Sequence, residues 1–242
     1  TEPGPGDVYR SHTFTSSGTF EVTAAGSGTP AITSIGYIVV AGGGGGGLGG
    51  DFTGYQAGGG GGGAGGLLAS PDLAPPTTNQ GGSVTAAIGS YAVTIGAGGQ
   101  GGFSAPSVSD TKEGKSGSDS SIAFPSTITS TGGGGGAGNP VAAKTGGSGG
   151  GGEGAYSPAP AKVAAAGTNV GSTNQQGYPG GAGSDTPQSP DWRAGGGGGG
   201  AGAAGEAGYP ASDAAVPSTA SRGGVGLQIK IASSPASDQL IG

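Results

Sequence analysis

Side chains that could perform catalysis are few in this sequence. It contains one histidine, His12, and no cysteine. A serine–histidine–carboxylate arrangement is therefore possible only around His12, and thiolate chemistry is excluded. His12 stands at the start of an alternating segment that is typical of a β-hairpin, so we expect it on the surface of a strand. We therefore predict that the protein is not an enzyme and uses no cofactor.

Two short motifs match parts of known ligand-binding sequences without completing them. Gly114, Lys115 and Ser116 match the end of a phosphate-binding loop, but Ser109 stands where that motif requires glycine. Residues 180–185 match the first part of a calcium-binding nonapeptide repeat. That repeat works by stacking many copies, and the match occurs once here. We interpret residues 180–185 as a turn after a glycine segment, and we expect no metal site.

Aromatic side chains between the glycine-rich segments are the main candidates for binding. Tyrosine and tryptophan offer rigid contact area with a polar group, as binding loops on rigid scaffolds do. Trp192 beside Arg193 is the best single candidate for a contact point. The alternative, weighted about equally, is that some of these rings cap the scaffold or pack on its sides. The candidate contact residues are Phe52, Tyr55, Phe103, Tyr156, Trp192, Arg193 and Tyr209.

Runs of glycine are the elements that must position these residues. A glycine run cannot build an apolar core, but it can form polyproline-II helices, which have three residues per turn and no internal hydrogen bonds. The backbone groups of such helices point outward and need partners, so several helices can bond side by side. We predict a bundle of parallel polyglycine-II rods, in which six residues span roughly 19 Å. The glycine segments are residues 42–47, 58–63, 96–102, 132–138, 146–152, 177–183, 195–200 and 223–226.

Composition limits the other possibilities. The chain has 65 glycines and 17 prolines in 242 residues, a bias that is typical of disordered low-complexity sequence. Here the tracts recur at similar lengths between segments of different composition, which favours an ordered bundle over disorder. The net charge of −6, with only 9% charged residues, argues against nucleic acid as a partner. No apolar run approaches the roughly 18 residues of a membrane span, so we expect no membrane insertion.

Short segments of β pattern predict a base for the bundle. Residues 8–23 and 83–95 are typical of hairpins, and residues 121–131 alternate loosely. Residues 37–41 form a continuous apolar run, typical of a buried strand, that leads directly into the first glycine tract. Because strands lead into rods at Ala41 and Ile95, we expect the connections at residues 51–57 and 103–117 at the far end of the bundle.

The predicted fold is mainly irregular and β, with essentially no α-helix. A small β-strand base carries a bundle of polyglycine-II helices with loops at both ends. Residues 1–41 supply an N-terminal hairpin and strand, and residues 225–242 supply a C-terminal strand and tail. Residues 42–224 form the bundle, with its loops and the short strands at 83–95 and 121–131.

The order of these segments resembles that of a known family. The stretches SHTFTSSGTFEVT, YIVVAGGGGGGLGG, VTIGAGGQGG, SDSSIAFPSTITSTGGGGGAG and GGVGLQIKI look like successive signatures of the glycine-rich domain of bacteriophage tail fibre and tail tip adhesins. The resemblance covers the chain from about residue 13 to residue 231. It implies a polyglycine-II sandwich whose terminal loops contact the host receptor. Those loops vary within the family, so the resemblance assigns no individual contact residue.

Three functions are open on this reading. The leading hypothesis is a receptor-binding module in the tail fibre or tail tip of a virion, binding a host cell-surface protein or glycan and adjoining a neighbouring tail or fibre protein. The second is a structural surface or filament protein in which the bundle is a spacer. The third is an ice-binding bundle, against which the irregular, aromatic-bearing loops argue.

Overall fold

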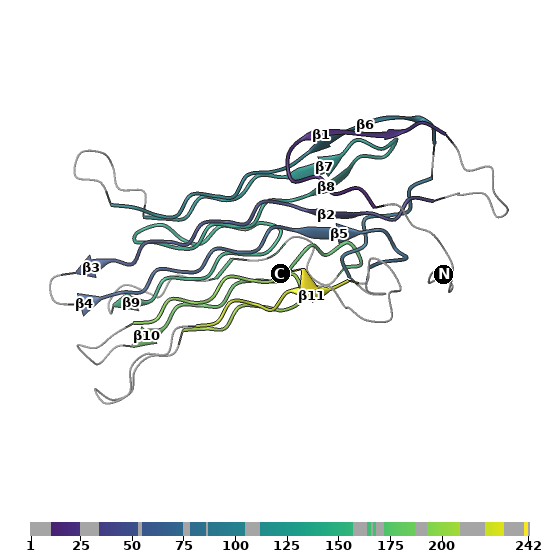
Figure 1. Ribbon diagram of the computed structural model, residues 1–242. Coiled ribbons are helices and arrows are strands. Elements are labelled where there is room, and N and C mark those ends of the chain that lie inside the picture. The colour runs from purple at the N-terminus through teal and green to yellow at the C-terminus, as the bar shows by residue number, and fades with distance from the viewer. Residues whose placement is uncertain are drawn as a thin grey trace.

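A computed structural model describes most of the 242-residue chain. The described residues are 11–24, 34–52, 55–74, 78–85, 87–104, 112–156, 164–165, 167, 172–186, 193–208, 221–229 and 240–241. Within these ranges the chain forms no helix, and short strands lie at both ends of an elongated body whose middle consists of rods (Figure 1). The predicted class, mainly β and irregular, is confirmed.

The rods are helices with three residues per turn. The amides of Gly42, Gly45 and Leu48 donate hydrogen bonds of 3.0, 2.9 and 2.7 Å to carbonyl groups of one neighbouring segment. The bonds to that neighbour recur every third residue, which is the period of a polyproline-II helix. We number the rods along the chain: rod 1 (42–48), rod 2 (58–66), rod 3 (96–102), rod 4 (112–118), rod 5 (131–138), rod 6 (147–154), rod 7 (177–184), rod 8 (193–200), rod 9 (203–208) and rod 10 (221–226).

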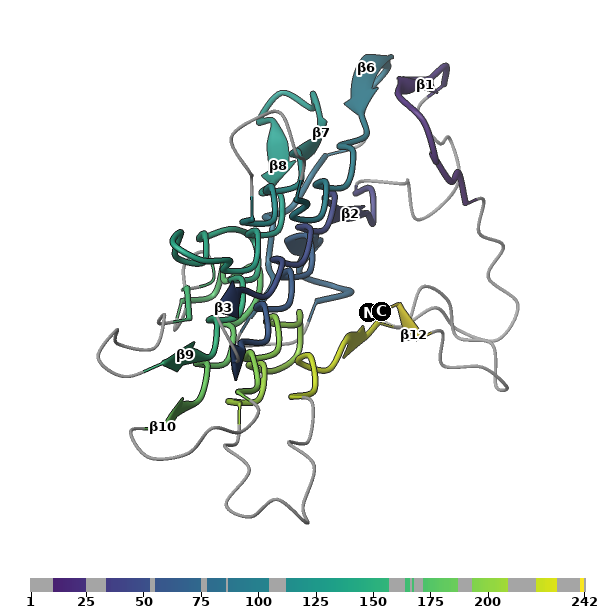
Figure 2. The same cartoon turned by 90° about the vertical axis from the view of Figure 1, so that its left-hand side faces the viewer.

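Backbone hydrogen bonds arrange the rods in layers, seen from one end in Figure 2. Layer A contains rods 3, 1, 2, 8 and 10 in that order, and layer B contains rods 4, 5, 6, 7 and 9. The bonds that join layer A, donor first, are Gly99 to Gly43, Gly44 to Gly63, Gly58 to Arg193 and Gly224 to Gly198. Those that join layer B are Gly114 to Gly136, Gly134 to Ser148, Gly149 to Tyr178 and Gly205 to Pro179.

A short third layer, layer C, covers part of layer B. It consists of the segments around Lys144 and Ala165. The amide of Gly150 in rod 6 donates to the carbonyl of Lys144, and the amide of Ala165 donates to the carbonyl of Gly150, both at 3.0 Å. Rods 5 and 6 therefore lie inside the bundle, and every residue in 132–138 and 146–154 is buried.

Rod 4 corrects the prediction of a loop at residues 103–117. Its residues 112–118 form a rod, although only Gly114 and Gly117 are glycine. A Cβ atom on either would meet a backbone carbonyl of rod 1. The side chains between them can be larger because rod 4 lies at the edge of its layer, where Ser116 is exposed. Glycine at every third position is therefore enough for a rod with one crowded face.

The base contains most of the large apolar side chains. One sheet has the strand order β1-β6-β7-β8, and a second pairs β2 with β5. Phe124 packs in the middle of the main cluster, with ring-centroid distances of 5.0 Å to Tyr91 and 6.0 Å to Tyr37. The strands are β1 (Gly18–Val22), β2 (Ile38–Val40), β5 (Leu67–Ala69), β6 (Gly89–Thr94), β7 (Ser120–Ile122), β8 (Ile128–Ser130), β11 (Leu227–Gln228) and β12 (Leu240–Ile241).

Tyr37 ties this cluster to the loop beside it. Its hydroxyl group donates a 2.6 Å hydrogen bond to the carbonyl of Gly82, the described glycine that has a positive φ. Burial, and to a smaller degree the charge of Asp72, raises the pKa of Tyr37 to about 12. The phenol therefore remains a protonated donor over the whole neutral range.

Strand pairing in the base differs from the predicted hairpins. β1 pairs with β6 rather than with residues 12–15, and β6 does not pair with residues 83–87. β5 lies outside all the segments predicted as strands; it is completely buried and pairs antiparallel with β2. Of the predicted closing strand, the residues that the structure describes form a strand only at β11, which pairs with β12 in the predicted tail. The predictions are wrong here because alternation identifies a strand but not its partner.

Candidate functional site at the distal end

Three aromatic candidates lie at the end of the bundle opposite the base, which we call the distal end. Rods 1 and 2 are joined there by β3 (Asp51–Phe52) and β4 (Tyr55–Gln56), which pair antiparallel. β9 (Ala155–Tyr156) continues rod 6 and pairs in parallel with β10 (Asp185–Thr186), which continues rod 7. Figure 1 shows all four strands at this end. The fold thus places the backbones of Phe52, Tyr55 and Tyr156 at the same end of the bundle.

Phe103 is the described aromatic side chain that the distal end exposes most clearly. It follows rod 3, whose last amide, that of Gly102, donates to the carbonyl of Gly46 at 2.8 Å. Its exposed fraction is 39%. Val141 lies in the distal turn after rod 5 with an exposed fraction of 36%. The sequence analysis missed Val141 because a single valine after Asn139 and Pro140 carries no distinguishing pattern.

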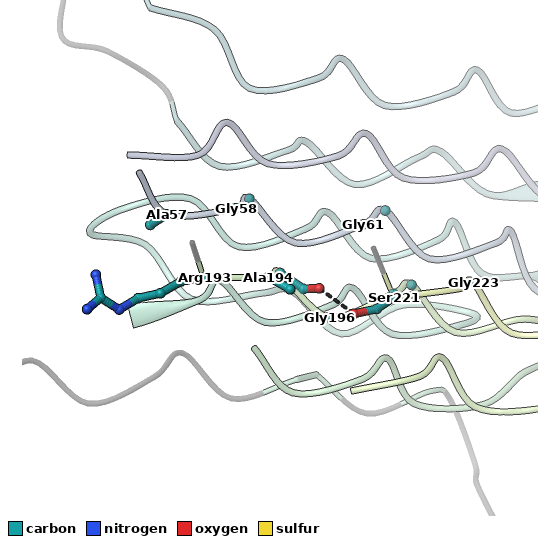
Figure 3. Close-up of a pocket in the computed structure, with 13 residues that line it drawn as sticks. Ala57, Gly58, Gly61, Arg193, Ala194, Gly196, Ser221 and Gly223 are labelled. Carbon is teal, nitrogen blue, oxygen red and sulfur yellow. Dashed lines mark hydrogen bonds between the residues drawn. The ribbon is translucent and has the colours of Figure 1, made fainter. Parts of the chain in front are cut away.

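Arg193 has the position of an anchor for its loop. It begins rod 8, and its carbonyl accepts a 2.7 Å hydrogen bond from the amide of Gly58. Its exposed fraction is 3%, and its side chain extends along the bundle toward the distal end (Figure 3). Next to it, the hydroxyl group of Ser184 and the backbone of Ala194 bond to each other at 3.0 and 3.2 Å. This burial weighs against direct contact with a partner, so the contact role of Arg193 stays a prediction.

Trp192 and Tyr209 lie outside the described residues. Their described neighbours are Arg193 and Gly208. The amide of Gly208 donates a 2.8 Å hydrogen bond to the carbonyl of Ala182, near the distal end of rod 7. Of these two described neighbours, Gly208 therefore lies at the distal end of the bundle.

Charged side chains join rod 4 to layer C. Lys115 Nζ lies 2.7 Å from Glu113 Oε1, and Lys144 Nζ lies 3.5 Å from the same oxygen. The hydrogen bond from Lys115 is the largest of the effects that lower the pKa of Glu113. A carboxylate that pairs with two cations is better suited to holding rod 4 and layer C together than to acting as a general acid or base.

A groove on the side of the bundle offers no catalytic side chain. It has a volume of about 570 Å³ and lies along rods 2, 8 and 10 (Figure 3). Glycine and alanine supply most of its lining, together with Arg193 and Ser221. The hydroxyl group of Ser221 donates a 2.6 Å hydrogen bond to the carbonyl of Gly195. The groove can therefore offer backbone groups and shape, but no general acid or base.

Metal binding and membrane crossing find no support in the described ranges. No three acidic or histidine side chains gather there in a way that could hold a metal ion. The same residues include no helix with the length and apolarity needed to span a bilayer. His12 is exposed, with its ring 5.7 Å from that of Phe20. It lies outside β1, so the strand-surface position predicted for it is wrong, although its exposure agrees.

The chain matches one known family over most of its length. Residues 15–239 match the family described as a glycine-rich domain. Because the match covers most of the sequence, the chain belongs to this glycine-rich domain family. The comparisons with curated proteins and with solved structures gave no match.

Proposed function

We propose that this protein is a non-enzymatic receptor-binding module of a phage tail fibre or tail tip, acting outside the cell as part of a virion. Its partner would be a protein or glycan on the host surface. The observation that carries the proposal is the gathering of aromatic-bearing connections at one end of a stiff bundle. Phe103 is exposed at that end, and the backbones of Phe52, Tyr55 and Tyr156 lie there too.

Rigidity supports this role. Binding by a flexible loop loses affinity because the loop must be ordered on contact. Here β3 and β4 fix both ends of one distal connection, and the pairing of β9 with β10 fixes the starts of two more. A scaffold bonded through its backbone can also tolerate changes in its loops, as an attachment protein requires.

The decisive experiment measures attachment to cells. Fluorescently labelled protein is incubated with a broad panel of bacterial strains, and binding is quantified by flow cytometry. We expect saturable binding to a subset of strains. We expect Phe103→Ala to weaken it by about 30-fold, the effect of losing an aromatic contact worth about 2 kcal/mol. Replacing the connections after rods 3, 6 and 7 by glycine and serine should abolish it.

Ile88→Ala is the matched control. Ile88 is 67% exposed at the base, so its loss should leave both attachment and stability unchanged. Attachment that persists after the distal connections are replaced, or that is lost equally in the Ile88 variant, contradicts the proposal. Absence of binding to every strain of the panel also contradicts it.

A structural spacer remains the second candidate, because the bundle has a glycine-lined lateral face that could pack against another molecule. A spacer would be indifferent to the sequence of its distal connections. The same replacement experiment therefore separates the two functions.

A further inference from the structure

Layer A has a face that no described residue covers. In its central rods, one residue of each three donates a hydrogen bond to layer B, and a second residue donates to another neighbouring rod. The third residue of each period donates no hydrogen bond within the described part of the chain. These residues are Gly43 and Gly46 in rod 1, Gly59 and Gly62 in rod 2, and Gly195 and Gly198 in rod 8.

Rod 6 shows what a covered rod looks like. It lies in layer B between layers A and C, and every amide in residues 147–152 donates a hydrogen bond. In rod 5, which is also buried in layer B, Gly135 is the one residue whose amide donates no hydrogen bond within the described part of the chain, whereas in the central rods of layer A such amides recur every third residue. This recurrence is not a general property of the rods.

Packing within the chain requires glycine at Gly59, Gly62, Gly195 and Gly198, where an added Cβ would meet a carbonyl oxygen of the neighbouring rod, but not at the outward positions of rods 1, 3 and 10. A Cβ atom on Gly46 would have no atom nearer than 3.6 Å, and one on Gly43, Gly98, Gly101 or Gly223 none nearer than 3.7 Å. None of these residues has a positive φ, so alanine could adopt their backbone conformation. Because glycine raises the entropy lost on folding, its presence here calls for a partner that approaches the backbone closely.

We propose that the open face of layer A docks on the same face of a second copy of this chain. The open face repeats, on the other side of the same rods, the surface that these rods already bury against layer B. Rods bond to neighbours of either direction: rod 3 runs with rod 1, and rod 2 runs against it. The rods of a second copy can therefore be bonded in either orientation. The open glycine positions carry no charge, so a chain with net charge −6 meets little repulsion there.

The shape of the face fits a twofold pair. Gly46 is exposed on rod 1, which lies beside the groove and which we call the ridge, whereas Gly198 is buried on the floor of the groove between rods 2 and 10. A ridge beside a groove on one face is self-complementary, because a twofold axis puts the ridge of each copy against the groove of the other. This lateral face is separate from the distal end, so the dimer does not depend on the proposed receptor-binding role.

Introduced cysteines test the contact directly, because the chain has none of its own. Gly46→Cys on the ridge and Gly223→Cys on the rim of the groove both leave room for a side chain. Rods 2 and 8 separate these positions within one chain, which prevents an intramolecular disulfide. We expect the double variant to form disulfide-linked dimers on mild oxidation, and the wild type to sediment as a dimer at micromolar concentration.

Gly46→Glu should shift the sedimentation of the protein to that of a monomer without lowering its melting temperature. Gly18→Glu is the control. Its Cβ would lie 3.6 Å from Phe14 at the base, so the dimer should persist. A wild type that stays monomeric up to about 1 mM, where the weakest specific contacts would show, overturns the proposal and leaves the face to solvent or to another partner. A dimer that survives Gly46→Glu overturns it as well.

Discussion

Glycine serves a different purpose here from its usual one. In most turns glycine is needed for its access to positive φ, and Gly82 is such a case. In the rods it is needed because it lacks a side chain. An added Cβ at Gly60 would meet the carbonyl of Gly151 in the next layer, whereas one at Gly46 would make only ordinary van der Waals contacts, the nearest at 3.6 Å.

This difference predicts opposite outcomes for one substitution. Gly60→Ala should lower the free energy of unfolding by about 1–3 kcal/mol or more, because backbone on both sides must move. Gly46→Ala should leave it unchanged or raise it by about 0.4–1 kcal/mol, because it restricts only the unfolded chain. Urea denaturation at a concentration where the chain is monomeric measures both. Equal effects of the two substitutions would refute the role assigned to the missing side chain.

For the candidate contact residues, the sequence shows the type of each side chain but does not predict how far that side chain is exposed. Phe103 follows a glycine tract and is exposed at the distal end, as predicted. Arg193 also adjoins a glycine tract, but the bridge between it and Ala57 places it inside the bundle. Nothing in a glycine-rich sequence distinguishes a residue that begins a rod from one that ends a loop, because the rod boundary depends on which neighbour supplies the hydrogen bonds.

At the scale of single elements, the strand-to-rod junctions were predictable and the rod partners were not. The apolar run at β2 leads into rod 1, and β6 leads into rod 3, as the composition indicated. The neighbours of each rod could not be predicted because glycine rods are chemically alike. Their order is set by the lengths of the connections and by strand pairing in the base.

Rod 4 is the element that tests how little glycine a rod needs. Gly117→Ala should destabilise the protein by about 1–3 kcal/mol, because its Cβ would meet the carbonyl of Gly42. Ser116→Ala, one residue earlier on the exposed face, should change stability by less than about 0.5 kcal/mol. Thermal unfolding of the two variants under identical conditions gives the comparison. If Gly117→Ala were as harmless as the serine change, residues 112–118 would be a loop after all.

Across the whole molecule, stability should increase from the outside toward layer B. Because the amides of residues 147–152 all donate and lie inside the bundle, they should exchange with solvent deuterium only in global unfolding. The amides of Gly43, Gly46, Gly59 and Gly62 should exchange quickly in dilute protein. Hydrogen exchange followed by nuclear magnetic resonance resolves these sites. Uniform exchange along all rods would contradict a layered bundle.

Different interactions stabilise different parts of the molecule. Apolar side chains stabilise the base, where Phe124 and its neighbours pack. Main-chain amides stabilise the middle. The distal end contributes least to apolar packing and to main-chain hydrogen bonding. Its sequence can therefore change most freely without loss of the fold.

The threefold period also restricts how such a scaffold can change length. Adding one residue to rod 5 would turn every following amide by a third of a revolution, away from its acceptors in rods 1 and 6. Adding three would restore the alignment and lengthen the rod by about 9 Å. Insertions and deletions in related sequences should therefore come in multiples of three residues and should occur in several rods at once.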